Sequence, residues 1–248
     1  MSALLALVFG LIALIYASVG FGGGSSYTAL LTLTGIDKAL IPMISLSCNI
    51  VVVTGGTWRF WKAGLIDWRR VLPLLLVSAP LAFLGGLTPL KEQTFLLILG
   101  STLLLSALAL MLPLDRLPQR KLSPPMILGL SGLVGLLAGL SGIGGGIFMS
   151  PVLHLIRWSD AKRIAAFASL YILVNSITGL IGQLIKGGVQ SFAEPAATYW
   201  PLLLAVLVGG QLGSMIGIKL LSPLWLRRVT ALLVGYAAVR LLWQALGA

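Results

Sequence analysis

The sequence predicts an all-α integral membrane protein that is built from two inverted repeats. Each repeat is expected to contain a re-entrant helical hairpin, broken by glycines, and three transmembrane helices. The prediction rests on a scarcity of charged residues, an internal repeat and the distribution of basic residues among the loops. Of the 248 residues, 58% are hydrophobic and only 9% are charged, whereas soluble domains carry about 25% charged residues. A water-soluble fold of this size could not cover its surface with so few charges.

The two halves of the chain share a sequence pattern, which indicates a duplicated unit. Gly20–Gly24 reads Gly-Phe-Gly-Gly-Gly and is matched 122 residues later by Gly142–Gly146, which reads Gly-Ile-Gly-Gly-Gly. Further matches follow in the same order: Asp37-Lys38 and Asp160-Ala161-Lys162, Ser45-Leu46 and Ser169-Leu170, Thr54-Gly55 and Thr178-Gly179, and Pro73 and Pro201. We therefore expect a first membrane repeat over 1–112, a basic, proline-rich cytoplasmic linker over 113–125 and a second membrane repeat over 126–248.

Each repeat contains one long apolar segment that the glycines interrupt, over 4–35 and 126–157. The uninterrupted segments cover 39–57, 71–88, 94–112, 163–185, 198–220 and 225–245. An unbroken helix of 32 residues would be about 48 Å long, whereas two complete crossings need about 40 residues. Because glycine clusters break helices, we expect each interrupted segment to enter the membrane, break at the glycines and return to the same side.

Basic residues in the loops favour this topology, because Lys and Arg collect on the cytoplasmic side of membrane proteins. If the interrupted segments are hairpins, thirteen loop Lys and Arg lie on one side, and only Lys38, Lys91 and Lys186 lie on the other. If those segments cross once, the loops divide eight against eight. The hairpin topology makes the second repeat inverted and places both termini outside the cytoplasm. Inverted repeats with broken helices are typical of secondary transporters.

Tryptophans and basic residues alternate between the first two uninterrupted segments, in an order that is typical of a membrane interface. The residues concerned are Trp58, Arg59, Trp61, Lys62, Trp68, Arg69 and Arg70. We expect Arg59, which lies near a segment end, to extend its side chain toward the headgroups. Asp37 and Asp160 stand before matching segments and are expected to cap the helices that follow them.

The two glycine clusters are the candidate anion site. A short helix is expected to begin after each cluster, and a helix N-terminus presents unpaired backbone N–H groups and a partial positive charge. Hydroxyl and amide side chains of the next segments, Ser176 among them, could complete the shell of an anion. The candidate substrate-binding residues are Gly22, Gly23, Gly24, Ser25, Ser26, Gly144, Gly145, Gly146, Ile147, Phe148, Ser45, Asn49, Ser169 and Asn175. The alternative is that the glycines allow close helix packing and that the polar residues bond between helices.

Other kinds of chemistry lack the residues that they need. The single Cys48 and the single His154 cannot build a cluster of metal ligands, and no nucleotide-binding glycine fingerprint or Ser/His/Asp set is visible. We therefore expect no catalytic residue, no enzyme activity, no metal and no cofactor. The net charge of +11 is explained by cytoplasmic loops rather than by a nucleic-acid partner.

The paired glycine motifs, Pro151 five residues after the second motif, and the Ser-Leu pairs at 45–46 and 169–170 resemble the TauE/SafE family of sulfite and organosulfonate exporters. The resemblance covers essentially the whole chain. It implies export of a small sulfur-containing anion, such as sulfite or a sulfonate, across the bacterial inner membrane by a secondary transporter with alternating access. Ala29 stands where Pro151 has its match, so the two half-sites differ chemically.

The partners that we expect are a small anionic substrate and membrane lipid, with a homodimer as a further hypothesis and no nucleic acid. Two other functions stay open at this point. One is an anion channel, and the other is a non-transporting membrane subunit that docks a partner through its basic face.

Overall fold

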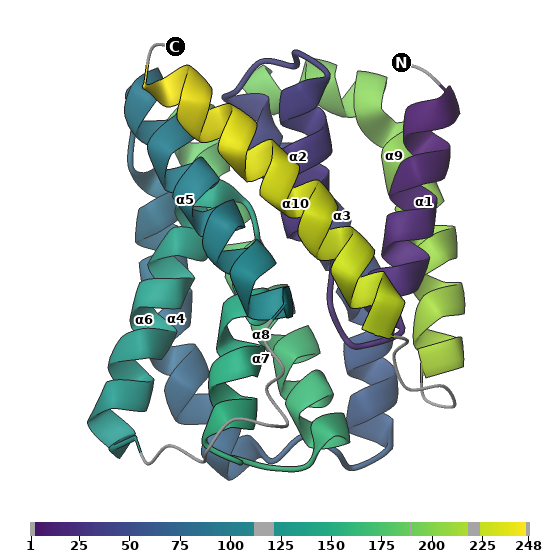
Figure 1. The fold of residues 1–248 in the computed structure, drawn as a ribbon, viewed down its shortest axis with the longest axis vertical. Coiled ribbons are helices and arrows are strands. Elements are labelled where there is room, and N and C mark those ends of the chain that lie inside the picture. The colour runs from purple at the N-terminus through teal and green to yellow at the C-terminus, as the bar shows by residue number, and fades with distance from the viewer. Residues whose placement is uncertain (1–2, 112–121, 189, 218–223, 247–248) are drawn as a thin grey trace.

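The computed structural model describes residues 3–111, 122–188, 190–217 and 224–246. These residues form ten helices and contain no strand (Figure 1). The helices are α1 (Ala3–Ala17), α2 (Gly24–Leu33), α3 (Leu40–Lys62), α4 (Trp68–Leu87), α5 (Glu92–Met111), α6 (Pro124–Ser141), α7 (Gly146–Leu155), α8 (Ala161–Gly187), α9 (Gln190–Gly217) and α10 (Leu224–Ala245). In the described part of the chain, five helices are long and apolar enough to cross a membrane: α3, α4, α6, α8 and the 197–216 part of α9. The predicted all-helical, multi-pass membrane class is confirmed.

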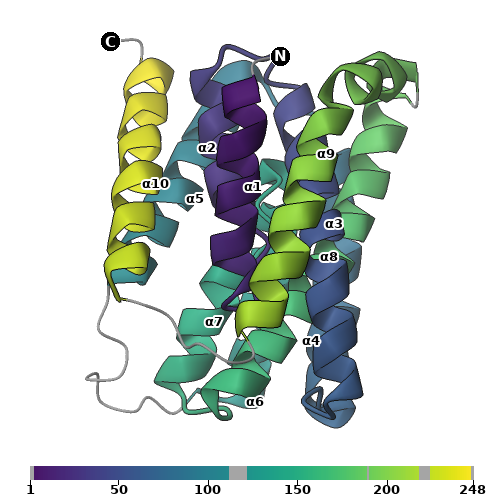
Figure 2. The same cartoon turned by 90° about the vertical axis from the view of Figure 1, so that its right-hand side faces the viewer.

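Both predicted interruptions are real breaks between helices. The first break separates Ala17 from Gly24, and the second separates Ser141 from Gly146. The residues before α2 and α7, Gly23 and Gly145, have φ values of 95° and 82°, a backbone conformation that strains any L side chain. In Figure 1 and in the orthogonal view of Figure 2, α1 and α2 occupy the upper half of the molecule, and α6 and α7 occupy the lower half. Each pair therefore turns back about halfway along the molecule.

Helices of the first half pack against helices of the second half in a paired arrangement. α1 packs along α9 and α6 packs along α4, while α3 packs against α8 and α5 against α10. If each helix of the first half is exchanged with its counterpart in the second half, the same set of contacts results. Several contacts are close because glycine has no side chain: a Cβ on Gly209 would lie 2.0 Å from the Gly10 carbonyl oxygen, and one on Gly139 would lie 1.9 Å from that of Ala82. For these glycines the packing role typical of membrane helices is the better explanation.

Two local predictions differ from the structure. α3 continues to Lys62, so Trp58 and Trp61 lie on its last turns, and only residues 63–67 connect it to α4. The continuation places the Lys62 ammonium over the Trp58 ring, 4.8 Å from its centroid. The interfacial mixture of Trp and basic residues is thus mostly helical, since one aromatic and cationic face can lie at the headgroups without interrupting a helix.

The two aspartates that precede α3 and α8 also behave differently. The Asp160 carboxylate accepts a hydrogen bond from the Arg163 N–H at 3.0 Å and caps α8, as predicted. The prediction for Asp37 is wrong, because α3 begins at Leu40 and its N-terminal flanking residue is Ala39. The Asp37 carboxylate instead accepts from the Ala39 N–H at 3.0 Å, which lies outside the helix, so it forms a turn before α3 and no cap.

Candidate functional site

The two glycine breaks touch each other inside the molecule, and Ser45 of α3 joins them. The Ser45 hydroxyl donates to the carbonyl oxygen of Gly142 at 2.8 Å and lies 3.2 Å from that of Gly24. A Cβ on Gly24 would lie only 2.6 Å from the Ile143 carbonyl oxygen. Ser45, Gly24 and Ile143 are all buried. Segments that are more than 100 residues apart in the sequence therefore form one buried junction, which we call the glycine junction (residues 22–24 and 142–146).

Asn49, one helical turn after Ser45, lies against both sides of the glycine junction. A Cβ on Gly22 would lie 2.3 Å from Asn49 Oδ1, and Cβ atoms on Gly24 and Gly144 would lie 2.5 and 2.9 Å from Asn49 Nδ2. The side chain has no exposed surface, and among the described residues neither its oxygen nor its nitrogen has a hydrogen-bond partner. Burying an amide without a partner costs about 1–3 kcal/mol. An amide that is held in this way at a backbone junction points to a polar ligand.

The first turns of α2 and α7 add backbone donors at the same place. The N–H groups of Gly24, Ser25, Gly146 and Ile147 donate to no acceptor within the described residues. A first helical turn has no intrahelical acceptors for these groups, and the helix dipole gives it a partial positive charge. Because both helices begin about halfway along the molecule (Figure 1), both N-termini lie in its interior. Their donors suit a small anion.

In the second repeat, Ser176 and Ile172 of α8 also lie against the glycine junction. The Ser176 hydroxyl would be 3.2 Å from a Cβ on Gly144, and it is fully buried without a partner. Ile172 would be 3.3 Å from a Cβ on Gly22 and 2.5 Å from one on Gly146. Ser176 belongs to the polar side chains that were expected to complete the shell of an anion, whereas Ile172 was not predicted, although its spacing of four from Ser176 places both on one helical face.

The predicted Asn175 is fully buried like Asn49, and its amide lies near the Tyr171 hydroxyl but makes no hydrogen bond of normal geometry with the described residues. None of its atoms is among the three nearest to any position of the glycine junction. The other predicted asparagine of the pair, Asn49, contacts both breaks. The two asparagines are therefore equally buried, but only Asn49 lies against the glycine junction.

Other predicted site residues have partners of their own. The Ser169 hydroxyl shares a hydrogen bond with Thr57 Oγ1 at 2.9 Å, and the Ser26 hydroxyl shares one with the Tyr16 hydroxyl at 2.9 Å. Ile147 and Phe148 pack their side chains into an apolar cluster with α5 and α10, so only their backbone could contact a ligand. The tight Gly23 and Gly145 turns lie under aromatic rings: Cβ atoms there would be 2.8 Å from Tyr27 Cζ and 3.1 Å from Tyr171 Cε1.

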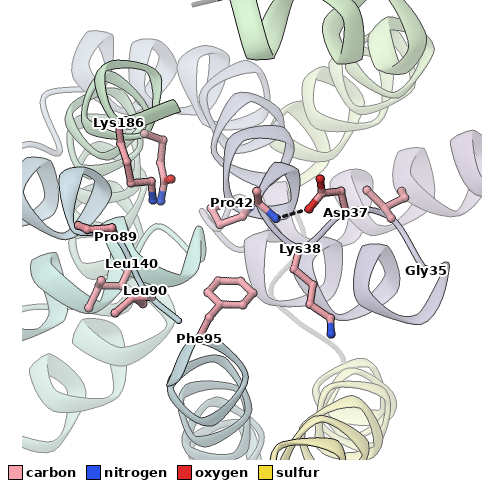
Figure 3. Close-up of a pocket in the computed structure, with 12 residues that line it drawn as sticks. Gly35, Asp37, Lys38, Pro42, Pro89, Leu90, Phe95, Leu140 and Lys186 are labelled. Atoms are coloured by element: carbon pink, nitrogen blue, oxygen red, sulfur yellow. Dashed lines mark hydrogen bonds between the residues drawn. The ribbon is translucent and has the colours of Figure 1, made fainter. Parts of the chain in front are cut away.

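A cavity of about 570 Å³ lies at the upper end of the molecule, between the ends of several helices (Figure 3). Its lining residues are Gly35, Ile36, Asp37, Lys38, Ala39, Pro42, Pro89, Leu90, Phe95, Leu140, Gln183 and Lys186. Figure 3 shows Lys186 and Lys38 on opposite sides of the cavity, with Phe95 between them. Pro42 connects the cavity to the glycine junction, because a Cβ on Gly142 would lie 2.6 Å from Pro42 Cα. One wall of the cavity therefore contacts the junction.

Comparison with known proteins gives a family and two relatives. Residues 5–241 match the family described as sulfite exporter TauE/SafE. A protein of Sinorhizobium fredii (strain NGR234) that is named "probable membrane transporter protein" is 34% identical over 249 residues, which cover 96% of this chain and 97% of that protein. A protein of Methanocaldococcus jannaschii with the same description is 25% identical over 248 residues, which cover 94% and 92%. No solved structure matches the chain.

Proposed function

The chain belongs to the sulfite exporter TauE/SafE family, and on that premise we propose that it is a secondary transporter that exports a small sulfur-containing anion, such as sulfite or a sulfonate, by alternating access. The family and the names of the relatives indicate a membrane transporter rather than an enzyme. The main support for an anionic substrate is Asn49. Its buried amide has no hydrogen-bond partner among the described residues, and it lies where the two glycine breaks meet.

The glycine junction supplies the kind of donors that a small oxyanion needs. Backbone N–H groups from the first turns of α2 and α7 lack acceptors, and Asn49 Nδ2 adds an amide donor. Hydrogen bonds to a charged group contribute about 1.5–3 kcal/mol each. The side chains at the junction are neutral, so the site has no carboxylate that would repel an anion and no cation that would hold it too tightly for release.

The arrangement of the helices supports two inverted repeats, 1–112 and 126–248, with α1–α2 and α6–α7 as the re-entrant hairpins. The two hairpins occupy opposite halves of the molecule (Figure 2), and the main helix contacts are preserved when the halves are exchanged. The linker at 113–125 falls mostly outside the described residues. This arrangement is the one that alternating access uses in many secondary transporters.

Charge supports an orientation in a bacterial inner membrane with the upper end, where both termini lie (Figure 1), outside the cytoplasm. The helix ends and loops at the lower end carry Arg59, Lys62, Arg69, Arg70, Arg157, Lys162 and Arg163, whereas those at the upper end carry Lys38, Lys91 and Lys186. Cysteines introduced at Lys38 and Asp160, in a chain without Cys48, should react with an impermeant maleimide from opposite sides. Labelling of both from the same side would rule out the inverted arrangement.

The cavity at the upper end would then be the extracytoplasmic opening of the route. Lys186 lies at its wall and is exposed, and its ammonium donates to the Thr88 carbonyl oxygen at 3.5 Å. A cation at a narrow opening raises the local concentration of anions, and salt screens this effect. We expect Lys186→Gln to raise the KM for sulfite from the upper side about threefold at low salt, while Lys91→Gln, which is outside the cavity lining, leaves it unchanged. An equal KM for Lys186→Gln at every salt concentration would contradict this role.

Purified protein provides the test of the proposed function itself. In a thermal-shift panel with sulfite, sulfate, thiosulfate and small sulfonates, the transported anion should raise the Tm by mass action. In proteoliposomes, saturable exchange of that anion supports a transporter. High flux that does not saturate indicates an anion channel, and no flux with any anion of the panel indicates a non-transporting subunit.

A further inference from the structure

We infer that Arg59 is the anion-binding residue at the lower mouth of the transport route, and that its bonds to α9 hold this mouth closed. The inference rests on the proposed function, because it assumes that an anion moves between the two ends of the molecule. It adds a cation-bearing site to a route whose central junction is neutral.

The internal repeat places Arg59 opposite Gln183. In α3 and α8 the matching residues are 124 positions apart, as in Ser45 and Ser169 or Gly55 and Gly179. The same spacing pairs Arg59 with Gln183 and Lys62 with Lys186. Gln183 and Lys186 both line the cavity at the upper end. In an inverted repeat, Arg59 therefore holds the position at the lower end that Gln183 holds at the upper mouth.

Arg59 does not simply extend to the headgroups as the sequence predicts. Its guanidinium is half-buried and donates to Ser214 Oγ and, at 2.8 Å, to Gln211 Oε1, both on α9. Gln211 itself is pressed against α3, because a Cβ on Gly55 would lie 2.2 Å from Gln211 Oε1. None of the salt bridges between described residues includes Arg59. Its positive charge is thus bound only by neutral groups, and a charge held in this way near a transport route is a candidate ligand site.

Hydroxyl groups connect Arg59 with the α3 face that carries Asn49. Asn49, Val53 and Thr57 are spaced by four residues on α3, so they share one face. Ser169 of α8 donates to the Val53 carbonyl oxygen at 3.3 Å and bonds with Thr57 at 2.9 Å. A Cβ on Gly56 would lie 3.3 Å from the Ser169 hydroxyl and 3.8 Å from Ser214 Cβ. Polar groups therefore lie along the α3–α8–α9 contact between the α3 face that carries Asn49 and the guanidinium.

An oxyanion at the lower mouth would compete with Gln211 and Ser214 for the guanidinium. A guanidinium binds an oxyanion with two parallel, charge-assisted hydrogen bonds, which are stronger than its bonds to a neutral amide and a hydroxyl. Capture of the anion would thus release α9 from α3, and binding and opening would be coupled at one residue. The upper mouth, where an amide stands at the matching position, would bind the same anion more weakly.

The test compares transport from the two sides of the membrane. The protein is reconstituted in proteoliposomes, its orientation is determined by maleimide labelling, and [35S]sulfite is followed under nitrogen. We expect Arg59→Gln to raise the KM from the lower side by about tenfold or more, which corresponds to the loss of one charge-assisted bond, and to leave the KM from the upper side unchanged. Arg69→Gln is the matched control, because Arg69 is an exposed arginine at the same end, and it should change neither KM.

Three results would overturn the inference. They are an unchanged lower-side KM in Arg59→Gln, an equal rise of the KM from both sides in that variant, and the same rise of the KM in Arg69→Gln. The last result would show that general positive surface charge, and not Arg59 itself, attracts the anion. If Arg59→Gln does not fold, Arg59→Lys is the variant to test. The lysine keeps the charge but cannot form two parallel hydrogen bonds, so the lower-side KM should still rise. A wild-type KM in this variant would contradict the role of Arg59. Absence of flux in the unaltered protein would instead refute the proposed function, and the two failures are therefore distinguishable.

Discussion

The two glycine breaks both end at a left-handed glycine, Gly23 or Gly145, but their surroundings differ. The first break is polar on its side-chain face: Ser26 bonds with Tyr16, and Asn49 lies against Gly22 and Gly24. The second break has more apolar neighbours, since Ile147 packs into a hydrophobic cluster and Ile172 covers Gly146, although Asn49 and the Ser176 hydroxyl lie against Gly144. At the spacing of 124 residues, Asn49 corresponds to Leu173, so its amide has no counterpart in the second repeat.

This difference indicates that the two repeats share the helix N-terminus that follows each break, and do not share a set of side chains. Each repeat supplies a helix N-terminus with free N–H groups, and one of them also supplies the amide that contacts both breaks. A symmetric pair of side-chain sites would bind an anion equally from either half. In the observed arrangement the amide comes from the first repeat alone, and Ile172 of the second repeat lies against Gly22 and Gly146. Substitutions at matched positions in the two repeats can therefore separate the contributions of backbone and side chain.

The largest difference is expected between Gly24→Ala and Gly146→Ala. The new methyl group at Gly24 would meet the Ile143 carbonyl oxygen at 2.6 Å, which is backbone and cannot move alone, whereas at Gly146 it would meet Ile172 Cδ1 at 2.5 Å, the end of a flexible side chain. Overpacking costs about 1–3 kcal/mol, and we expect Gly24→Ala at the upper end of this range with loss of sulfite exchange. Gly146→Ala should keep measurable exchange. Thermal melting and exchange assays of both variants test this, and equal loss in the two would remove the distinction between the breaks.

The next largest difference is expected between Asn49→Ala and Asn175→Ala. Both amides are fully buried and without partners, so their removal should change the Tm of the ligand-free protein by similar, small amounts. Only Asn49 lies against the glycine junction, and a hydrogen bond to a charged group is worth about 1.5–3 kcal/mol, or roughly 10- to 100-fold in affinity. We therefore expect Asn49→Ala to weaken sulfite binding by at least about tenfold. Thermal-shift titrations measure the affinity, and an equal loss in Asn175→Ala would show that Asn49 has no special place.

The sequence is sufficient to predict the breaks because their causes are local. A glycine run and a segment that is too long for one crossing are visible in the residues themselves, and α2 and α7 begin within one residue of the expected positions. Contacts between the repeats are not local. That Asn49 contacts Gly144, or that Ile172 covers Gly22 and Gly146, depends on how α3 and α8 pack against each other, and one sequence gives no register for that packing.

Equal residues at matched positions can also acquire different partners. Ser45 and Ser169 occupy the same place in the repeat, but the residue twelve positions after Ser45 is Thr57, whereas the one twelve after Ser169 is Ile181. Thr57 offers its hydroxyl to Ser169 across the α3–α8 contact, while Ile181 can offer nothing to Ser45. Ser45 therefore bonds to the backbone of the glycine junction, and Ser169 does not.

The smallest of the three differences is expected between Ser45→Ala and Ser169→Ala. Each variant loses about one net hydrogen bond, which is worth about 0.5–1.5 kcal/mol, so both should lower the free energy of unfolding to a similar extent. Only the Ser45 hydroxyl joins the backbone of the two breaks, and its loss should let the two helix N-termini separate slightly and weaken sulfite binding by about threefold. Denaturation measures the first quantity and a thermal-shift titration the second. If Ser169→Ala weakens binding as much as Ser45→Ala, the two repeats contribute alike to the site, and the asymmetry would reside in Asn49 alone.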